Sequence, residues 1–95
     1  MKKIGEVIFQ GTICNLMKSY YLSNGNNVLE LEEKETGEPF LTASVNMTRS
    51  LADDEVYIKD YSENEGIKSI LTMDGFIGEE IKTVQTGITI HKLLK

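Results

Sequence analysis

His91 has the clearest capacity for acid–base chemistry, because it is the only histidine in the 95-residue chain. A serine or cysteine nucleophile is activated by a base that titrates near neutral pH, so such a pair has to combine His91 with Cys14 or Ser62. No G-x-S-x-G turn surrounds either candidate nucleophile. His91 also alternates with Ile88 and Ile90, which predicts that it faces solvent on the outer side of a strand. The sequence therefore predicts no catalytic residue.

The string DYSENEG, residues 60 to 66, gathers oxygen-bearing side chains that could bind a hard cation. Counted from Asp60, oxygens occupy the first, third and fifth positions of a calcium loop. However, the loop glycine comes one position late, and Leu71 replaces the glutamate required at the twelfth position. One cysteine and one histidine cannot form a tetrahedral zinc site, and no glycine-rich phosphate loop is present. We therefore predict no metal and no cofactor.

The start of a helix accounts for most of this string. Ser62 and Glu65 have the spacing of a capping box, in which each side chain accepts a hydrogen bond from the backbone N–H of the other residue. Apolar residues at helical spacing follow, and Gly75 is a stop signal, so one helix is predicted over residues 62 to 74. Within that helix Gly66 costs about 1 kcal/mol relative to alanine. The helix explains neither Gly66 nor Tyr61, and both are residues that a binding surface could require.

We therefore predict a binding face at this corner of the chain. Its predicted residues are Tyr57, Lys59, Asp60, Tyr61, Glu63, Asn64 and Gly66. The four tyrosines could alternatively stack the bases of single-stranded nucleic acid. That role requires a positive groove, and only Lys18 and Lys59 are close enough in sequence to supply one. Tyrosines half-packed on a sheet are the simpler interpretation, because strands are enriched in tyrosine.

The elements that must position these residues read mostly as strands. Alternating and β-branched runs predict strands in residues 6–14 (with Gly11 as a bulge), 16–22, 28–33, 40–47, 55–60, 82–85 and 88–93. Turn signals occur at SNGNN, residues 23 to 27, and at ETGEP, residues 35 to 39. The predicted fold is α+β: a mostly antiparallel sheet of five to seven strands with one short helix at about 62–74. A small, strongly bent sheet is the alternative.

Length and charge limit the classes of function. A chain of 95 residues predicts a single domain spanning residues 1–95. Fifteen acidic residues against ten basic ones give a net charge of −5, which disfavours direct binding to duplex nucleic acid or to anionic membranes. The same charge is compatible with a protein whose acidic surface mimics nucleic acid and binds a basic partner. The single Cys14, the absence of an apolar signal region and the absence of a long apolar span predict a cytoplasmic protein.

Two segments resemble a family of small bacterial and phage proteins. They are LADDEVYIKDYSENEGI, residues 51 to 67, which precedes a helix and the closing TGITIHKLL, and ETGEPFLTASVNM, residues 35 to 47. The resemblance covers residues 28 to 94, and IKDYSENEG is its most specific string. The family is known as a domain of unknown function met on phages, plasmids and conjugative elements. It has no established catalytic residues, so the resemblance implies only an accessory protein of a mobile element that binds a host or defence component.

These observations predict a non-enzymatic protein that acts through protein–protein interaction, and its sharper form is an inhibitor of a host or defence protein. The alternative is a small-ligand or nucleotide binder whose pocket is built at the interface of an oligomer. The sequence leaves the existence of a homo-oligomer open. A hydrolase built on His91 is the third hypothesis.

Overall fold

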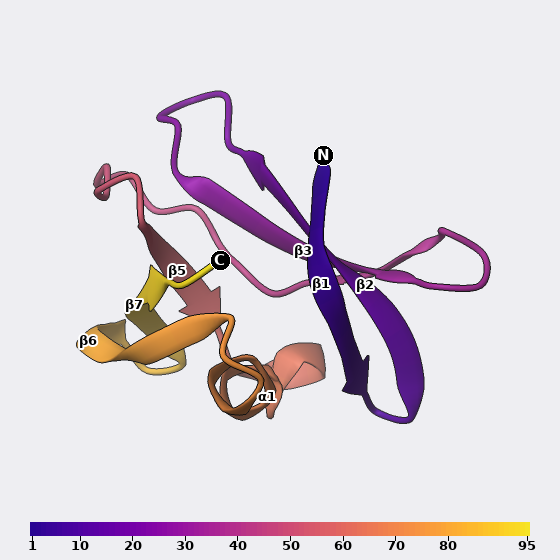
Figure 1. Cartoon of the computed structure of the whole chain (residues 1–95). Coiled ribbons are helices and arrows are strands. Elements are labelled where there is room, and N and C mark those ends of the chain that lie inside the picture. The colour runs from indigo at the N-terminus through magenta and orange to yellow at the C-terminus, as the bar shows by residue number, and fades with distance from the viewer.

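The computed structural model describes all 95 residues of the chain. It contains seven antiparallel strands in two sheets and one short α-helix, so the predicted α+β class is confirmed. Figure 1 looks along the helix and shows one sheet on each side of it. Neither helical segment has the length and apolar character needed to cross a membrane.

The first sheet is a meander of four strands in the order β1-β2-β3-β4. Their bounds are β1 Lys2–Phe9, β2 Thr12–Tyr20, β3 Asn27–Glu33 and β4 Pro39–Thr42. Leu29 and Leu31 share the inner face of β3, as the sequence predicts, and both are fully buried. Leu31 lies opposite Leu16 of β2, which is also fully buried. This inner face supplies much of the core.

A tight turn replaces the bulge predicted at Gly11. Gln10 and Gly11 have φ angles of 52° and 78°, and Phe9 pairs with Thr12 across the turn. The sequence predicted one strand over residues 6–14, which is wrong because the chain reverses in the middle of this run. The apolar run continues through the turn, and Gln-Gly is not among the strongest hairpin signals. Residues 16–20 of the strand predicted over residues 16–22 are therefore the second half of β2, and residues 21–22 lie beyond its end.

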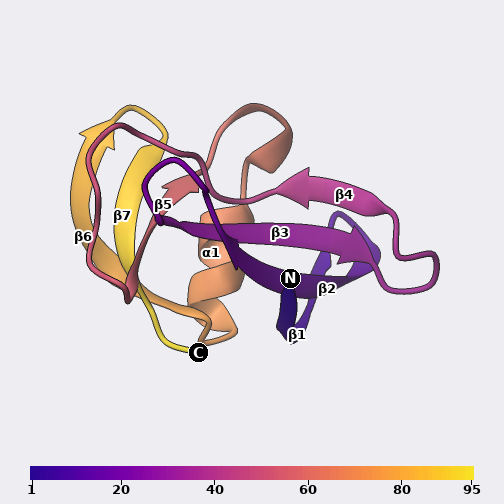
Figure 2. The same ribbon diagram turned by 90° about the horizontal axis from the view of Figure 1, so that it is seen from above.

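The second sheet has the order β5-β7-β6. Its strands are β5 Glu55–Lys59, β6 Ile77–Gln85 and β7 Ile88–Leu93. The strand β6 is at the edge of the sheet, and its pairing with β7 shifts register three times. Figure 2 shows β6 and β7 at one end of the molecule, far from the turn between β3 and β4. Bulges on an edge strand hinder pairing with other chains.

Residues 43 to 45, named the junction from here on, connect the two sheets. Ala43 donates its backbone N–H to Leu29 O at 2.8 Å and accepts one from Lys59 N at 2.9 Å. Ser44 forms an isolated antiparallel bridge with Ile58. The junction therefore bonds to β3 on one side and to β5 on the other, and the sheets share a boundary.

The predicted helix over residues 62–74 is broken into two pieces. A 3₁₀-helix, η1, spans Ser62–Asn64, and the α-helix α1 spans Ile67–Met73. The helix α1 packs Ile67 and Leu71, both fully buried, into a core of 13 residues between the sheets. Gly75 terminates it as predicted, because Phe76 N bonds to Leu71 O and Gly75 N to Thr72 O, the pattern of a Schellman motif.

Residues 46 to 54, the strap, cover the other face of the second sheet. Met47 and Leu51 of the strap pack on a cluster formed by Tyr57, Ile88 and Ile90. Both faces of β5 and β7 are therefore covered, one by α1 and the core and the other by the strap, whereas residues 79–85 of β6 are exposed.

Asparagine side chains from the turn between β2 and β3 hold the strap in place. Asn24 donates to Met47 O, Asn26 donates to Arg49 O and accepts from Leu51 N, and Asn27 donates to Asp53 O and Glu55 O. The string SNGNN thus forms the predicted turn and also latches a segment that lies some 25 residues later in the sequence.

Candidate interaction surface

The chain leaves β5 at Lys59 and presents Tyr61 at the surface. The Tyr61 side chain is 43% exposed. Its ring rests on Gly87, which lies in the turn between β6 and β7. A Cβ added at Gly87 would lie only 2.5 Å from Tyr61 Cδ1, so the ring needs bare backbone at this position. Tyr61 is therefore an exposed aromatic side chain with fixed support on one side.

Lys59 holds Tyr61 and Glu63 together. Its Nζ lies 5.0 Å from the centre of the Tyr61 ring and 2.9 Å from Glu63 Oε1. The hydrogen bond with Glu63 raises the pKa of Lys59, and the same bond lowers the pKa of Glu63. Both groups are therefore charged at neutral pH. Because both contacts lie at the surface, where solvent screens them, they restrict the ring and add little stability.

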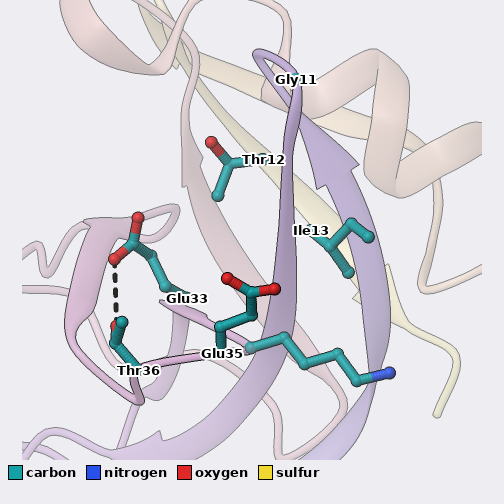
Figure 3. Close-up of a pocket in the computed structure, with 7 residues that line it drawn as sticks. Gly11, Thr12, Ile13, Glu33, Glu35 and Thr36 are labelled. Atoms are coloured by element: carbon teal, nitrogen blue, oxygen red, sulfur yellow. Dashed lines mark hydrogen bonds between the residues drawn. The ribbon is translucent and has the colours of Figure 1, made fainter.

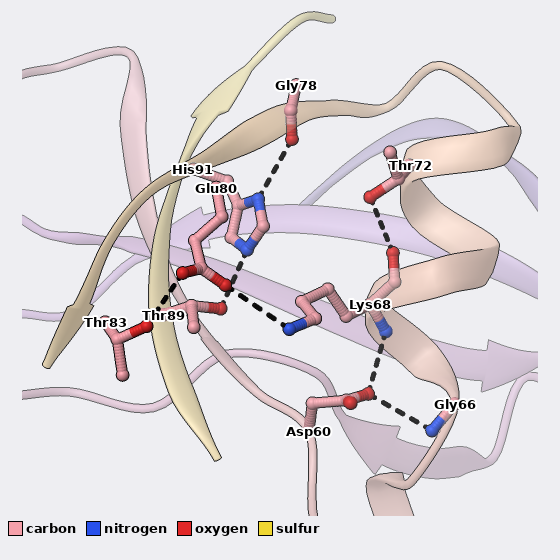
Figure 4. A network of polar contacts seen from close by, with 9 residues as sticks. All are labelled: Asp60, Gly66, Lys68, Thr72, Gly78, Glu80, Thr83, Thr89 and His91. Atoms are coloured by element: carbon pink, nitrogen blue, oxygen red, sulfur yellow. Dashed lines mark hydrogen bonds and ion pairs between the residues drawn. The ribbon is translucent and has the colours of Figure 1, made fainter. Parts of the chain in front are cut away.

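Asp60 fixes the path of the chain after β5. Its Oδ1 accepts backbone hydrogen bonds from Gly66 N at 3.1 Å and Lys68 N at 3.0 Å (Figure 4). Its own N–H donates to Gly87 O at 2.8 Å. Asp60 therefore caps the start of α1, the role that the sequence assigned to Ser62 and Glu65.

The predicted capping box is wrong. Ser62 has a φ of 58°, whereas a capping residue is normally extended, and neither η1 nor α1 has a capping bond from the side chain of its N-cap residue. The helix start is set by Asp60, two residues earlier.

Gly66 lies between the two helical pieces with a φ of 97°. This left-handed conformation is readily available only to glycine. A Cβ there would approach Phe9 Cε1 to 3.7 Å, an ordinary contact, so the position has room for a side chain. The single helix predicted from the sequence left Gly66 unexplained. The structure shows that it is needed for the backbone conformation between η1 and α1.

Tyr57 and Asn64 belonged to the predicted binding face, but both are buried. Tyr57 is 2% exposed under the strap and donates its hydroxyl to Arg49 O. Asn64 is fully buried and donates to Thr42 O and Lys59 O. Neither side chain can contact a partner of the folded protein. Lys59 and Asp60 are half-buried and Tyr61 and Glu63 are exposed, and we name these four residues the Tyr61 corner.

Two residues near this corner were not predicted from the sequence. Gly87, in the turn between β6 and β7, supports the Tyr61 ring. Gln10, in the β1–β2 turn, donates its side-chain amide to Glu63 O at 3.3 Å. Both contacts join segments that are distant in sequence, and nothing in the local pattern indicates them.

His91 is 1% exposed, so the prediction that it faces solvent is wrong. Its Nδ1 lies 2.9 Å from Gly78 O, a pure acceptor, so Nδ1 carries the proton in the neutral ring. Its Nε2 then accepts from Thr89 Oγ1 at 2.8 Å (Figure 4). The neighbour is Thr89 rather than the predicted Cys14 or Ser62. Thr89 and His91 are both buried on β7, and the bond from His91 to Gly78 O ties β7 to the start of β6.

A second set of polar contacts lies near His91, around the cavity between α1 and β6. Glu80 accepts from Thr83 Oγ1 at 2.7 Å and lies 3.5 Å from Lys68 Nζ. The Thr83 hydroxyl contributes most to the lowered pKa of Glu80, with a smaller contribution from Lys68. The space between α1 and β6 is thus a shallow polar cavity of about 340 Å³.

The largest depression lies elsewhere, between the β1–β2 and β3–β4 turns (Figure 3). It has a volume of about 600 Å³, and Ile13 is its one hydrophobic lining residue. Glu33, Glu35 and Lys34 supply its charges, and Thr36 donates to Glu33 at 3.0 Å. No group of three His, Cys, Asp or Glu side chains is placed to hold a metal ion.

No protein-family model, curated protein or solved structure matches the chain.

Proposed function

We propose that the chain is a non-enzymatic protein-binding module whose Tyr61 corner contacts a protein partner. The observation that carries this proposal is the state of the Tyr61 ring, which is 43% exposed although it is held between Gly87 and Lys59. An exposed aromatic side chain that is already fixed loses little conformational entropy on binding. Tyrosines of this kind are enriched among the residues that dominate binding energy at protein interfaces.

The charges of the corner favour a partner with a basic or hydrogen-bond-donating surface. Lys59 is its one cation and is already paired with Glu63, which leaves the charge of Asp60 in excess. The whole chain carries −5. We further propose, from the family resemblance, that the protein is a cytoplasmic accessory of a mobile element and that it inhibits a host or defence protein.

Affinity capture from a bacterial lysate tests the corner when it compares three forms of the chain. Tyr61→Ala removes the exposed ring. Tyr20→Ala is the matched control, because Tyr20 is 59% exposed and also lies under a lysine, with Lys18 Nζ 4.2 Å from its ring centre. We expect proteins recovered with the wild type and with Tyr20→Ala to be lost with Tyr61→Ala. Equal recovery by all three forms would refute the Tyr61 corner as the binding surface.

Gly87→Ala gives a second test that leaves Tyr61 in the sequence. The added Cβ occupies the space of the ring, so the ring must move from its support. We expect a loss of capture similar to that of Tyr61→Ala, with the chain still folded by circular dichroism. Full capture by folded Gly87→Ala would show that the fixed position of the ring is unimportant.

The depression in Figure 3 favours the alternative function, a small-ligand binder. Its volume suits a small molecule, but ligand pockets are usually lined by mostly hydrophobic residues, and Glu33 and Glu35 would repel a phosphate. A polar or cationic ligand fits this lining better than a nucleotide does. A ligand at 100 times its Kd stabilises a protein by ~2.7 kcal/mol, so a thermal-shift screen of nucleotides, divalent cations and polyamines tests this alternative. The absence of any shift would exclude these three classes at the concentrations used.

A further inference from the structure

Asn24 is the one asparagine of six that precedes a glycine. The backbone nitrogen of a glycine is the least hindered nucleophile that can attack the side-chain amide of the preceding residue. In this reaction a bond forms between Gly25 N and Asn24 Cγ, and the bond between Cγ and Nδ2 breaks. Ammonia leaves with the proton that Gly25 N gives up. Water then opens the five-membered ring to an aspartate or an isoaspartate, and no oxidant is needed.

The folded turn holds all three reacting groups. Gly25 N donates its proton to Tyr21 O at 2.8 Å, so the nucleophile is engaged. Asn24 Nδ2 donates to Met47 O at 3.0 Å, and Asn24 Oδ1 accepts from Asn26 N at 3.1 Å. Attack on Cγ requires the side chain to turn toward Gly25 N, which breaks these bonds. The reaction therefore proceeds from an opened turn, and its rate follows the population of that open state.

The product cannot restore the closed turn. An aspartate at this position has no N–H to donate, so its carboxylate faces the Met47 carbonyl oxygen and repels it. Met47 is one of the strap residues that cover the cluster of Tyr57, Ile88 and Ile90. The loss of the Asn24 bond thus weakens the strap beside that cluster and adds one negative charge to the chain.

We infer that Asn24 is a spontaneous modification site. It is protected while the turn between β2 and β3 is hydrogen-bonded to the strap, and it is converted to aspartate or isoaspartate when this turn opens. The inference is independent of the proposed binding role of Tyr61. It assigns a chemical consequence to the opening of one defined turn.

Peptide mapping by mass spectrometry during incubation at mildly alkaline pH tests this inference. The full chain is incubated in its native state and in urea, and the gain in mass from replacing an amino group by a hydroxyl is assigned to a residue. We expect the modification at Asn24 in urea and a rate roughly tenfold or more lower in the native state, because closed turns are protected. Equal rates in both states would overturn the gating, and reaction confined to another asparagine would overturn the site.

Two variants separate the effect of the hydrogen bonds to the strap from the reaction at Asn24 itself. Asn26→Ala removes the side-chain bonds to Asn46 Oδ1, Arg49 O and Leu51 N but keeps both partners of the Asn24 side chain and the Gly25 N bond. We expect it to react severalfold faster than the wild type under native conditions and equally fast in urea. Asn24→Gln lengthens the side chain, so the five-membered ring cannot form and the modification is absent in both states. An unchanged native rate in Asn26→Ala would show that the strap does not control the reaction.

Discussion

Asp60 illustrates how a single residue can overrule a sequence motif. Ser62 and Glu65 match the capping-box pattern, and the pattern alone gives no reason to reject it. The structure instead anchors Asp60 N to Gly87 O and Asn64 Nδ2 to Thr42 O, and these two bonds set the chain direction before the helix begins. A motif read along the sequence contains no information about these long-range bonds, so it could not predict which residue caps α1.

Substitutions of Asp60 test its capping role. Asp60→Ala leaves Gly66 N and Lys68 N without their acceptor, and we expect it to lower the free energy of unfolding by about 1 kcal/mol. Asp60→Asn keeps the oxygen and should lose less. Urea denaturation monitored by circular dichroism measures both. Ser62→Ala is the control and should be close to neutral. A larger loss for Ser62→Ala than for Asp60→Ala would reinstate the predicted capping box.

At the scale of elements, the alternation of side chains predicted correctly which residues share a face of a strand. It did not predict correctly whether that face is exposed to solvent. Leu29 and Leu31 of β3 were correctly placed on one face of a strand. In β7, Ile88 and Ile90 indeed lie opposite Thr89 and His91, but both sides are buried. Period-two alternation indicates which residues share a face, and whether that face meets water depends on what covers it. The strap and α1 cover β5 and β7, and their positions come from tertiary contacts.

The contact between β1 and the segment after α1 depends on Gly5, which has no side chain. Phe76 packs directly on Gly5, and a Cβ there would overlap Cζ and Cε1 of its ring. We expect Gly5→Ala to lower the free energy of unfolding by about 1–3 kcal/mol through overpacking. In a double-mutant cycle, Gly5→Ala should cost less in a Phe76→Leu background, where the ring is absent. Equal costs in both backgrounds, measured by urea denaturation, would place the strain elsewhere.

At the scale of the whole molecule, hydrogen bonds lower the pKa values of three surface carboxyl groups. The pKa of Glu6 is lowered mainly by its bond to Lys3, that of Glu63 by Lys59 and that of Glu80 by the Thr83 hydroxyl. A carboxyl whose pKa is lower in the folded state stabilises the protein above the unfolded pKa. This contribution disappears as pH falls through the folded value.

The melting temperature should therefore decrease as the pH falls, and one substitution can isolate the contribution of Glu63 to this decrease. The contribution of Glu63 is fully present above the ordinary pKa of a glutamate and is lost as pH falls through its lowered value. Lys59, whose pKa is raised, gives the opposite case: its contribution is fully present below the ordinary pKa of a lysine and is lost as pH rises through the raised value. We expect Glu63→Gln to show a smaller decrease in Tm than the wild type as pH falls from neutral through the range in which carboxyl groups titrate. Glu35→Gln, at the exposed β3–β4 turn, should follow the wild type. Parallel curves for all three proteins would contradict a role for Glu63.

The junction also determines how the protein unfolds. Ala43 bonds at the same time to Leu29 of one sheet and Lys59 of the other, and Ser44 Oγ accepts the Leu29 N–H as well. Neither sheet can detach without breaking bonds that the other sheet uses, so the two sheets should unfold in one cooperative transition. In native-state hydrogen exchange, the amides of Leu29, Ala43 and Lys59 should share one opening free energy, equal to that of global unfolding. A lower value for Lys59 alone would indicate that β5 and its sheet unfold as a separate unit.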